Sequence, residues 1–273
     1  MPPVAETGRV LGLRVVSGVV LGVVGIAAAV AGGWAFTGLA AVAGIAMAYE
    51  WDRLNGGTGL GPMGVIHGAA VVVAAILVTL GHVPVPVMVI LAAGVVTFVM
   101  AGDRDTPTSM HAAGVVYVSL APISMIWLRS APDVGLFAVL WIFAVVWATD
   151  TGAYFTGRAL GGPKLAPSIS PGKTWSGFFG GTAAAGLVGW FAASFMEGTA
   201  VAQIIAASLV VSVVGQIGDL LISKVKRVVG VKDTGTFIPG HGGVLDRLDS
   251  LLPTVPLVAV GVYVLQQRGV AWL

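Results

Sequence analysis

The chain has 273 residues, of which 57% are hydrophobic and only 10% are charged. Soluble domains carry about 25% charged residues, so this composition and a mean hydropathy of +0.97 exclude an ordinary soluble domain. The chain contains no cysteine, which excludes disulfides, thiolate metal sites and a cysteine nucleophile.

Nine apolar segments have about the length of a membrane span. They cover residues 15–33, 34–51, 63–81, 84–101, 112–128, 134–157, 176–196, 200–222 and 250–267. We therefore predict an all-α fold, a polytopic bundle of about nine transmembrane helices forming one integral membrane domain over residues 1–273. Residues 1–133 supply the N-terminal spans, and residues 134–273 supply the catalytic spans and loops. Because small residues let membrane helices approach closely, the 40 glycines agree with a bundle in lipid.

The first segment has two interpretations. Arg9 and Arg14 precede it, and the run 29–31 has the small-x-small pattern of a signal-peptide cleavage site. An ordinary first span in an alanine-rich membrane protein explains the same residues, and we favour it.

The basic residues orient the spans. With the N-terminus in the cytoplasm, only Arg129 and Arg268 of the 14 Lys and Arg residues fall outside. Cytoplasmic loops carry an excess of Lys and Arg, so this orientation is predicted. It places both long polar stretches, residues 157–175 and 223–249, on the cytoplasmic side of the cell (inner) membrane.

Two carboxylates lie inside predicted spans. Asp150 stands in the sixth span and Asp219 near the end of the eighth, each a turn or two before the cytoplasmic end. Charged groups in spans are costly and usually face a cavity or a partner. Ser223 is four residues after Asp219, and Tyr154 four after Asp150, so each pair shares a helix face. We expect a common water-filled pocket, although a salt bridge or snorkelling would also accommodate each aspartate.

The loop 223–249 concentrates charged and glycine residues. Its candidate binding residues are Ser223, Lys226, Arg227 and Lys232, and its candidate catalytic residues are His241, Asp246, Arg247 and Asp249. Juxtamembrane Lys and Arg also bind anionic headgroups, and Asp249 would also serve as a helix cap. The density of acids, bases and glycines favours a functional site.

The loop 157–175 contains Pro-Gly-Lys173-Thr174, which is similar to the end of a Walker A motif. The required earlier glycine is replaced by Ser168, and the sequence shows no βαβ unit around the run. The narrower expectation is that Lys173, Thr174 and the start of the next helix bind a phosphate.

These residue types indicate one kind of chemistry. Carboxylates without cysteine or a histidine cluster favour Mg²⁺, and Lys, Arg and glycine-rich backbone suit phosphate oxygens. A cytoplasmic pocket at lipid depth suits a lipid and a soluble polyphosphate. The residues therefore predict metal-assisted phosphoryl or nucleotidyl transfer to a lipid, without identifying the donor or the acceptor.

The stretch from Ser223 to Asp249 resembles the signature of the phosphatidate cytidylyltransferase (CDP-diacylglycerol synthase) family at every specified position. Asp150-Thr-Gly-Ala-Tyr154 and Ser170-Pro-Gly-Lys-Thr174 also look like motifs of that family. The family's Ser-Pro-Lys-Lys-Thr-Trp-Glu-Gly is altered here at Gly172 and Ser176, so the roles of the missing Lys and Glu do not carry over.

The resemblance implies that CTP and phosphatidate give CDP-diacylglycerol and pyrophosphate. It implies that Asp219 and Asp246 hold Mg²⁺, as one ion or two, with Asp150 and Ser223 close by. Lys226, Arg227, Lys232 and Arg247 would bind phosphates, and His241 would assist the leaving pyrophosphate. It also implies a homodimer among membrane lipids, with no nucleic acid partner.

Two alternatives remain. Another CTP-dependent lipid transferase or kinase would use the same parts with a different lipid. An ion-coupled transporter would use the intramembrane aspartates but needs polar residues along a path across the bilayer. Outside the cytoplasmic half, the charged residues and His82 lie in loops, which disfavours a transporter.

Overall fold

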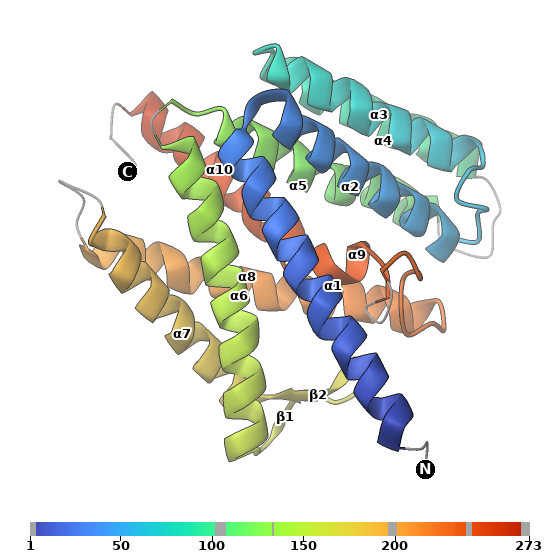
Figure 1. Ribbon diagram of the computed structural model, residues 1–273. Helices are drawn as coiled ribbons and strands as arrows, with labels where there is room; N and C mark the ends of the chain where they lie inside the picture. The colour runs from blue at the N-terminus through green and yellow to red at the C-terminus, as the bar shows by residue number, and fades with distance from the viewer. Residues whose placement is uncertain (1–3, 102–107, 133, 196–200, 239–241, 269–273) are drawn as a thin grey trace. The chain divides into compact units, whose positions relative to one another are not determined.

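The computed structural model describes residues 4–101, 108–132, 134–195, 201–238 and 242–268, which are mostly helical (Figure 1). The long helices are α1 (Val4–Ala31), α2 (Gly33–Leu54), α3 (Pro62–Thr79), α4 (Pro84–Ala101), α5 (Thr108–Arg129), α6 (Gly135–Leu160), α7 (Trp175–Ala193), α8 (Val201–Val228) and α10 (Leu251–Gln267). The short elements are strands β1 (Lys164–Ala166) and β2 (Ser170–Thr174) and helix α9 (Leu245–Leu248). Each predicted apolar segment coincides with a long helix, so the helical fold class is confirmed.

Five helices in the described ranges are long and apolar enough to cross a membrane, namely Pro62–Thr79, Pro84–Ala101, Ser109–Arg129, Gly135–Leu160 and Val201–Val228. Shorter apolar stretches are Val16–Ala31 and Leu251–Gln267. The chain therefore has the apolar helices of a membrane-embedded protein. The count of about nine spans and the cytoplasmic N-terminus stay predictions.

The chain divides into two compact units. Unit 1 comprises residues 1–130 and 229–248, and therefore contains α1 to α5 and α9. Unit 2 comprises residues 131–228 and 249–273, and contains α6, the two strands, α7, α8 and α10. The glycine-rich loop after α8 thus belongs to the unit formed by the first five helices.

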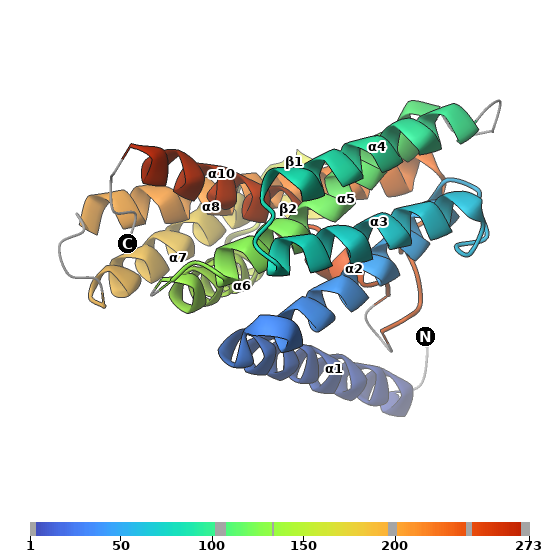
Figure 2. The same ribbon diagram turned by 90° about the horizontal axis from the view of Figure 1, so that it is seen from above.

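Unit 1 is held together by an apolar core between its helices. Ala74 and Ala75 of α3, Ile90 of α4, and Ile123 and Ile126 of α5 are all almost fully buried in one cluster. Helices α3, α4 and α5 run side by side in both views (Figures 1 and 2). Burial of such side chains contributes about 1.5–3 kcal/mol each in water, whereas in lipid close packing has the larger share.

Unit 2 depends on small residues between α6, α7 and α8. A Cβ at Gly181 of α7 would lie 2.6 Å from the Thr149 carbonyl oxygen of α6. A Cβ at Gly189 would lie 3.0 Å from the Ile204 carbonyl oxygen of α8. Because only glycine allows these approaches, the glycines let the helices pack backbone against backbone.

A short hairpin follows α6, in the region predicted as a loop. Strands β1 and β2 are antiparallel, with Lys164 opposite Thr174. The Thr174 hydroxyl accepts the Gly177 N–H at 3.1 Å, and so caps the start of α7. Figure 1 shows the hairpin between the C-terminal end of α6 and the N-terminal end of α7. The hairpin presents Lys173 next to a capped helix N-terminus.

Candidate active site

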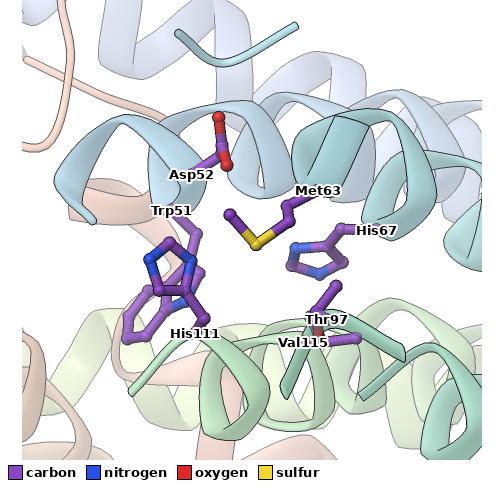
Figure 3. Close-up of a pocket in the computed structure, with 7 residues that line it drawn as sticks. All are labelled: Trp51, Asp52, Met63, His67, Thr97, His111 and Val115. Atoms are coloured by element: carbon purple, nitrogen blue, oxygen red, sulfur yellow. The ribbon is translucent and has the colours of Figure 1, made fainter. Parts of the chain in front are cut away.

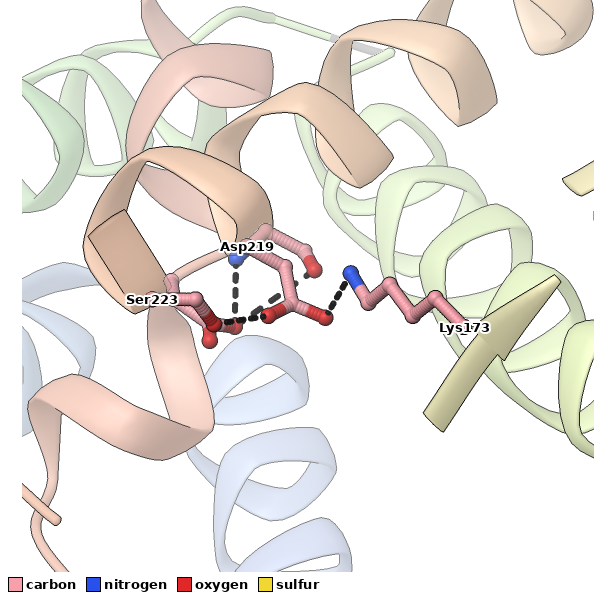
Figure 4. Close-up of polar contacts among 5 residues, drawn as sticks. Lys173, Asp219 and Ser223 are labelled. Carbon is pink, nitrogen blue, oxygen red and sulfur yellow. Dashed lines mark hydrogen bonds and ion pairs between the residues drawn. The ribbon is translucent and has the colours of Figure 1, made fainter. Parts of the chain in front are cut away.

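Asp219 is the centre of a polar cluster in unit 2. Its Oδ2 lies 2.5 Å from the Lys173 Nζ of β2, and its Oδ1 accepts the Ser223 hydroxyl at 3.3 Å. Figure 4 shows the carboxylate between Lys173 on one side and Ser223 on the other. The predicted shared face of Asp219 and Ser223 on α8 is therefore present, and the hairpin adds a cation to it.

Asp249, just before α10, extends this cluster with a second carboxylate. Burial, followed by the negative charge of Asp219, raises the pKa of Asp249 well above its usual range, and Asp150 acts in the same direction. The nearby Lys226 ammonium and the Ser250 N–H, a hydrogen bond of 2.8 Å, oppose this shift. Asp249 is thus close enough to both Asp219 and Asp150 for their negative charges to act on its carboxyl group.

The basic side chains at the end of α8 have different environments. Lys226 is buried, whereas Arg227 is exposed and donates from Nε to the Ile169 carbonyl at 3.2 Å. That contact ties the end of α8 to the segment between the two strands. The exposed Arg227 is therefore the accessible cation of the pair.

Asp246 organises the other polar cluster, in unit 1. Its Oδ2 accepts the Thr234 N–H at 2.8 Å, the Thr234 hydroxyl at 3.1 Å and the Gly243 N–H at 3.0 Å. Gly242 has a φ of 80°, a conformation that favours glycine. The loop thus folds around the Asp246 carboxylate. Lys232 and Arg247 are exposed near it in the sequence, and His241 lies outside the described residues.

Glu50 of α2, which the sequence analysis did not select, binds the same loop. Its Oε1 accepts the Val244 N–H at 2.9 Å, and its Oε2 accepts the Leu245 N–H at 2.8 Å and the Thr234 hydroxyl at 2.9 Å. Its side chain is fully buried. The one available signal was a carboxylate near the end of a mostly apolar helix, as at Asp150 and Asp219.

Comparison with known proteins identifies the family. Residues 12–265 match the cytidylyltransferase family. The chain belongs to the cytidylyltransferase family. A protein of Brucella suis biovar 1 named phosphatidate cytidylyltransferase is 39% identical over 245 residues, which is 90% of both chains.

Two further relatives with the same name match this chain over shorter stretches. The protein of Haemophilus influenzae is 47% identical over 130 residues, covering 46% of this chain and 45% of its own. The protein of Staphylococcus saprophyticus is 41% identical over 144 residues, covering 52% of this chain and 55% of its own.

The donor set of unit 2 fits a magnesium ion. Mg²⁺ is commonly held by one or two carboxylates together with substrate phosphates and water, and Asp219 and Asp249 supply two interacting carboxylates. The described residues contain no ready cluster of three His, Cys, Asp or Glu side chains. The predicted partner Asp246 lies in unit 1, so its pairing with Asp219 stays a prediction.

Of the two positions at which this chain departs from the motif, Ser176 has a structural role and Gly172 has none that the structure shows. The Ser176 hydroxyl donates to the Gly161 carbonyl and lies 2.9 Å from the Thr174 hydroxyl, so it joins the end of α6 to the start of α7. A Cβ at Gly172 would meet nothing within 4 Å. Thr174 is buried as a helix cap, and its phosphate role stays a prediction.

Unit 1 also contains a small cavity, shown in Figure 3. It is lined by Trp51, Asp52, Met63, His67, Thr97, His111 and Val115, and leaves about 10 Å³ for the centre of a water molecule. The buried Trp51 indole N–H has no hydrogen-bond partner among the described residues. A space of this size suits one buried water molecule, not a nucleotide. None of the predicted site residues lines it.

Proposed function

We propose that this cytidylyltransferase transfers the cytidylyl group of CTP to phosphatidate, giving CDP-diacylglycerol and pyrophosphate for phospholipid synthesis. The observation that carries the proposal is the match over 90% of the chain to a relative named for this activity. The cluster of Asp219, Lys173 and Asp249 in a protein with membrane-spanning helices supports it.

The reaction needs no nucleophile from the protein. A phosphatidate phosphate oxygen forms a bond to the α-phosphorus of CTP, while the bond from the α-phosphorus to the bridging oxygen breaks and pyrophosphate leaves with those electrons. Both reactants are anions, so the protein must position them and neutralise their charge. Mg²⁺ would supply much of that neutralisation at the phosphate oxygens.

The residues have separate roles in this proposal. Asp219 and Asp249 would hold Mg²⁺, Asp150 and Ser223 would assist, and Asp246 is the further predicted ligand. The Lys173 ammonium, which is paired with Asp219, would bind a phosphate oxygen of the substrates. Lys226, Arg227, Lys232 and Arg247 bind the remaining phosphate charge, and His241 assists the leaving pyrophosphate.

The setting of the enzyme is also part of the proposal. We infer a multi-pass protein of the cell (inner) membrane whose site faces the cytoplasm, where CTP is available, and a homodimer. The basis for the orientation is the distribution of the 14 Lys and Arg residues. With the N-terminus in the cytoplasm, only Arg129 and Arg268 fall on the outer side.

The position of the label in CTP tests the transfer. With purified protein, Mg²⁺ and phosphatidate, CTP labelled at the α-phosphorus should give a labelled lipid, and CTP labelled at the γ-phosphorus should not. Lipid label from the γ-phosphorus would instead indicate a CTP-dependent kinase. A preference for another lipid acceptor, such as a polyprenol, would overturn the assignment of phosphatidate.

A further inference from the structure

Glu50 is a buried carboxylate near the C-terminal end of α2, and its hydrogen-bond partners are far away in the sequence. The three groups that donate to it belong to Thr234, Val244 and Leu245, which follow it in the chain by 184, 194 and 195 positions. Both oxygens accept hydrogen bonds, two of them from backbone N–H groups. A buried charge is retained only where hydrogen bonds compensate for its desolvation, and this loop supplies them.

Thr234 connects Glu50 to Asp246. Its hydroxyl oxygen lies 2.9 Å from Glu50 Oε2 and 3.1 Å from Asp246 Oδ2. A hydroxyl has one proton to donate, so the two carboxylates compete for the same group. A change at Glu50 therefore reaches Asp246 through Thr234 as well as through the backbone.

Two glycines of the loop lie so close to the Glu50 carboxylate that a side chain there would collide with it. A Cβ at Gly235 would lie 2.6 Å from Glu50 Oε1, and a Cβ at Gly243 would lie 2.5 Å from Glu50 Oε2. Glu50 is fixed by its hydrogen bonds and has little freedom to move aside. Glycine at these positions lets the backbone close around the carboxylate.

We propose that Glu50 is a positioning residue for catalysis, which acts through Thr234 and the N–H groups of Val244 and Leu245 to fix Asp246. The proposal rests on the proposed function, since Asp246 has its role only there. Glu50 itself contacts no substrate. Its effect is to hold one conformation of the loop, and misplacement of a reacting geometry by about 1 Å costs about 100-fold in rate.

Asp52 provides a matched control on the same helix. It is also buried and also accepts a backbone N–H, that of Gly59 at 2.8 Å. Its bond organises the loop after α2, not the loop with Asp246. Replacing Glu50 or Asp52 by its amide therefore removes a buried carboxylate from the same turn of α2, with only one change reaching Asp246.

The test compares kcat and thermal stability for Glu50→Gln and Asp52→Asn in purified full-length protein. We expect Glu50→Gln to lower kcat about 10- to 100-fold, and Asp52→Asn to leave it within about twofold at a similar loss of Tm. Thr234→Val should lower kcat, and Thr234→Ser should restore it. Equal losses of kcat in Glu50→Gln and Asp52→Asn, or an unchanged kcat in Glu50→Gln, would overturn the proposal.

Hydrogen exchange keeps the two proposals distinguishable. In Glu50→Gln, the amides of residues 242–246 should exchange faster than in the wild type, while those of residues 56–61 should not change. If the wild type forms no CDP-diacylglycerol, the proposed function has failed. Faster amide exchange at residues 242–246 in Glu50→Gln would still show that Glu50 fixes the conformation of the loop. Unchanged exchange there would overturn that role of Glu50.

Discussion

At the scale of single residues, Asp249 gives the site a dependence on pH. Burial and the neighbouring Asp219 raise its pKa, so the folded protein binds this proton more tightly than the unfolded chain. Stability should therefore fall as pH rises from about 4, the usual pKa of an aspartate, through the raised pKa of the folded state.

Asp249→Asn should remove this part of the dependence. In EDTA, the Tm of the wild type should decline over that pH window more steeply than the Tm of the variant, measured in detergent. Mg²⁺ should raise the Tm of the wild type at the upper end of the window, because ligand binding to the folded state stabilises it. Parallel curves of Tm against pH for the wild type and Asp249→Asn would contradict the raised pKa of Asp249.

Lys173 is the cation that contacts Asp219, and Lys164 is its matched control in the hairpin. Lys164 stands on β1, is exposed, and pairs in register with Thr174. Lys173→Met should lower kcat/KM about 10- to 100-fold, the size expected for loss of a charge-assisted contact. Lys164→Met should change it by less than about threefold. A loss in both variants would point to damage to the hairpin instead.

Sequence reasoning selected Asp150, Asp219 and Asp249 as site candidates but did not select Glu50. These three stand in or beside predicted spans and motifs, and the charges of Asp219 and Asp150 both act on Asp249 in unit 2. Glu50 lies in no recognised motif, and its partners are 184 or more residues away. Contacts at such a separation arise from tertiary folding and leave no local pattern.

At the scale of elements, the contact between α6 and α7 depends on glycine. A Cβ at Gly181 would lie 2.6 Å from a backbone oxygen of α6, so Gly181→Ala should force the helices apart and cost about 1–3 kcal/mol. Gly261 of α10 is the control, because its Cβ would meet nothing within 4 Å. A Tm of Gly181→Ala equal to that of Gly261→Ala would show that the close approach contributes no stability.

The sequence predicted the long helices well and the hairpin not at all. Apolar segments of spanning length determine helices strongly, since lipid offers backbone groups no other partner. Strand β2 contains Pro171 and Gly172, which are rare in strands. It forms because Thr174 caps α7 and Ser176 bonds the end of α6. These contacts between elements outweigh the local preference.

At the scale of the whole molecule, the division into two units was not visible in the sequence. Residues 229–248 lie between α8 and α10, both in unit 2, yet they belong to unit 1. The bonds from Glu50 to Thr234, Val244 and Leu245 supply the physical reason. The family, by contrast, was evident from the motif in this same segment, because a signature depends on residue types and not on their partners.

The membrane orientation can be tested directly, because the natural chain has no cysteine. Single cysteines that replace His82 or Arg268 should react with a membrane-impermeant maleimide when the reagent can reach the outer face of the inner membrane and that membrane is intact. Cysteines at Lys164 and Lys224 should react only after the inner membrane is permeabilised. The unmodified protein is the background control, and labelling of Lys164→Cys without permeabilisation would reverse the orientation.

The measurement that tests the account most directly is the formation of labelled lipid from α-labelled CTP and phosphatidate by the purified protein. The account predicts lipid label that needs Mg²⁺, disappears with EDTA, and falls at least about 100-fold in Asp219→Asn while persisting in Asp52→Asn. Absence of label from well-folded wild-type protein, or undiminished label in Asp219→Asn, would contradict a metal-dependent cytidylyl transfer centred on Asp219.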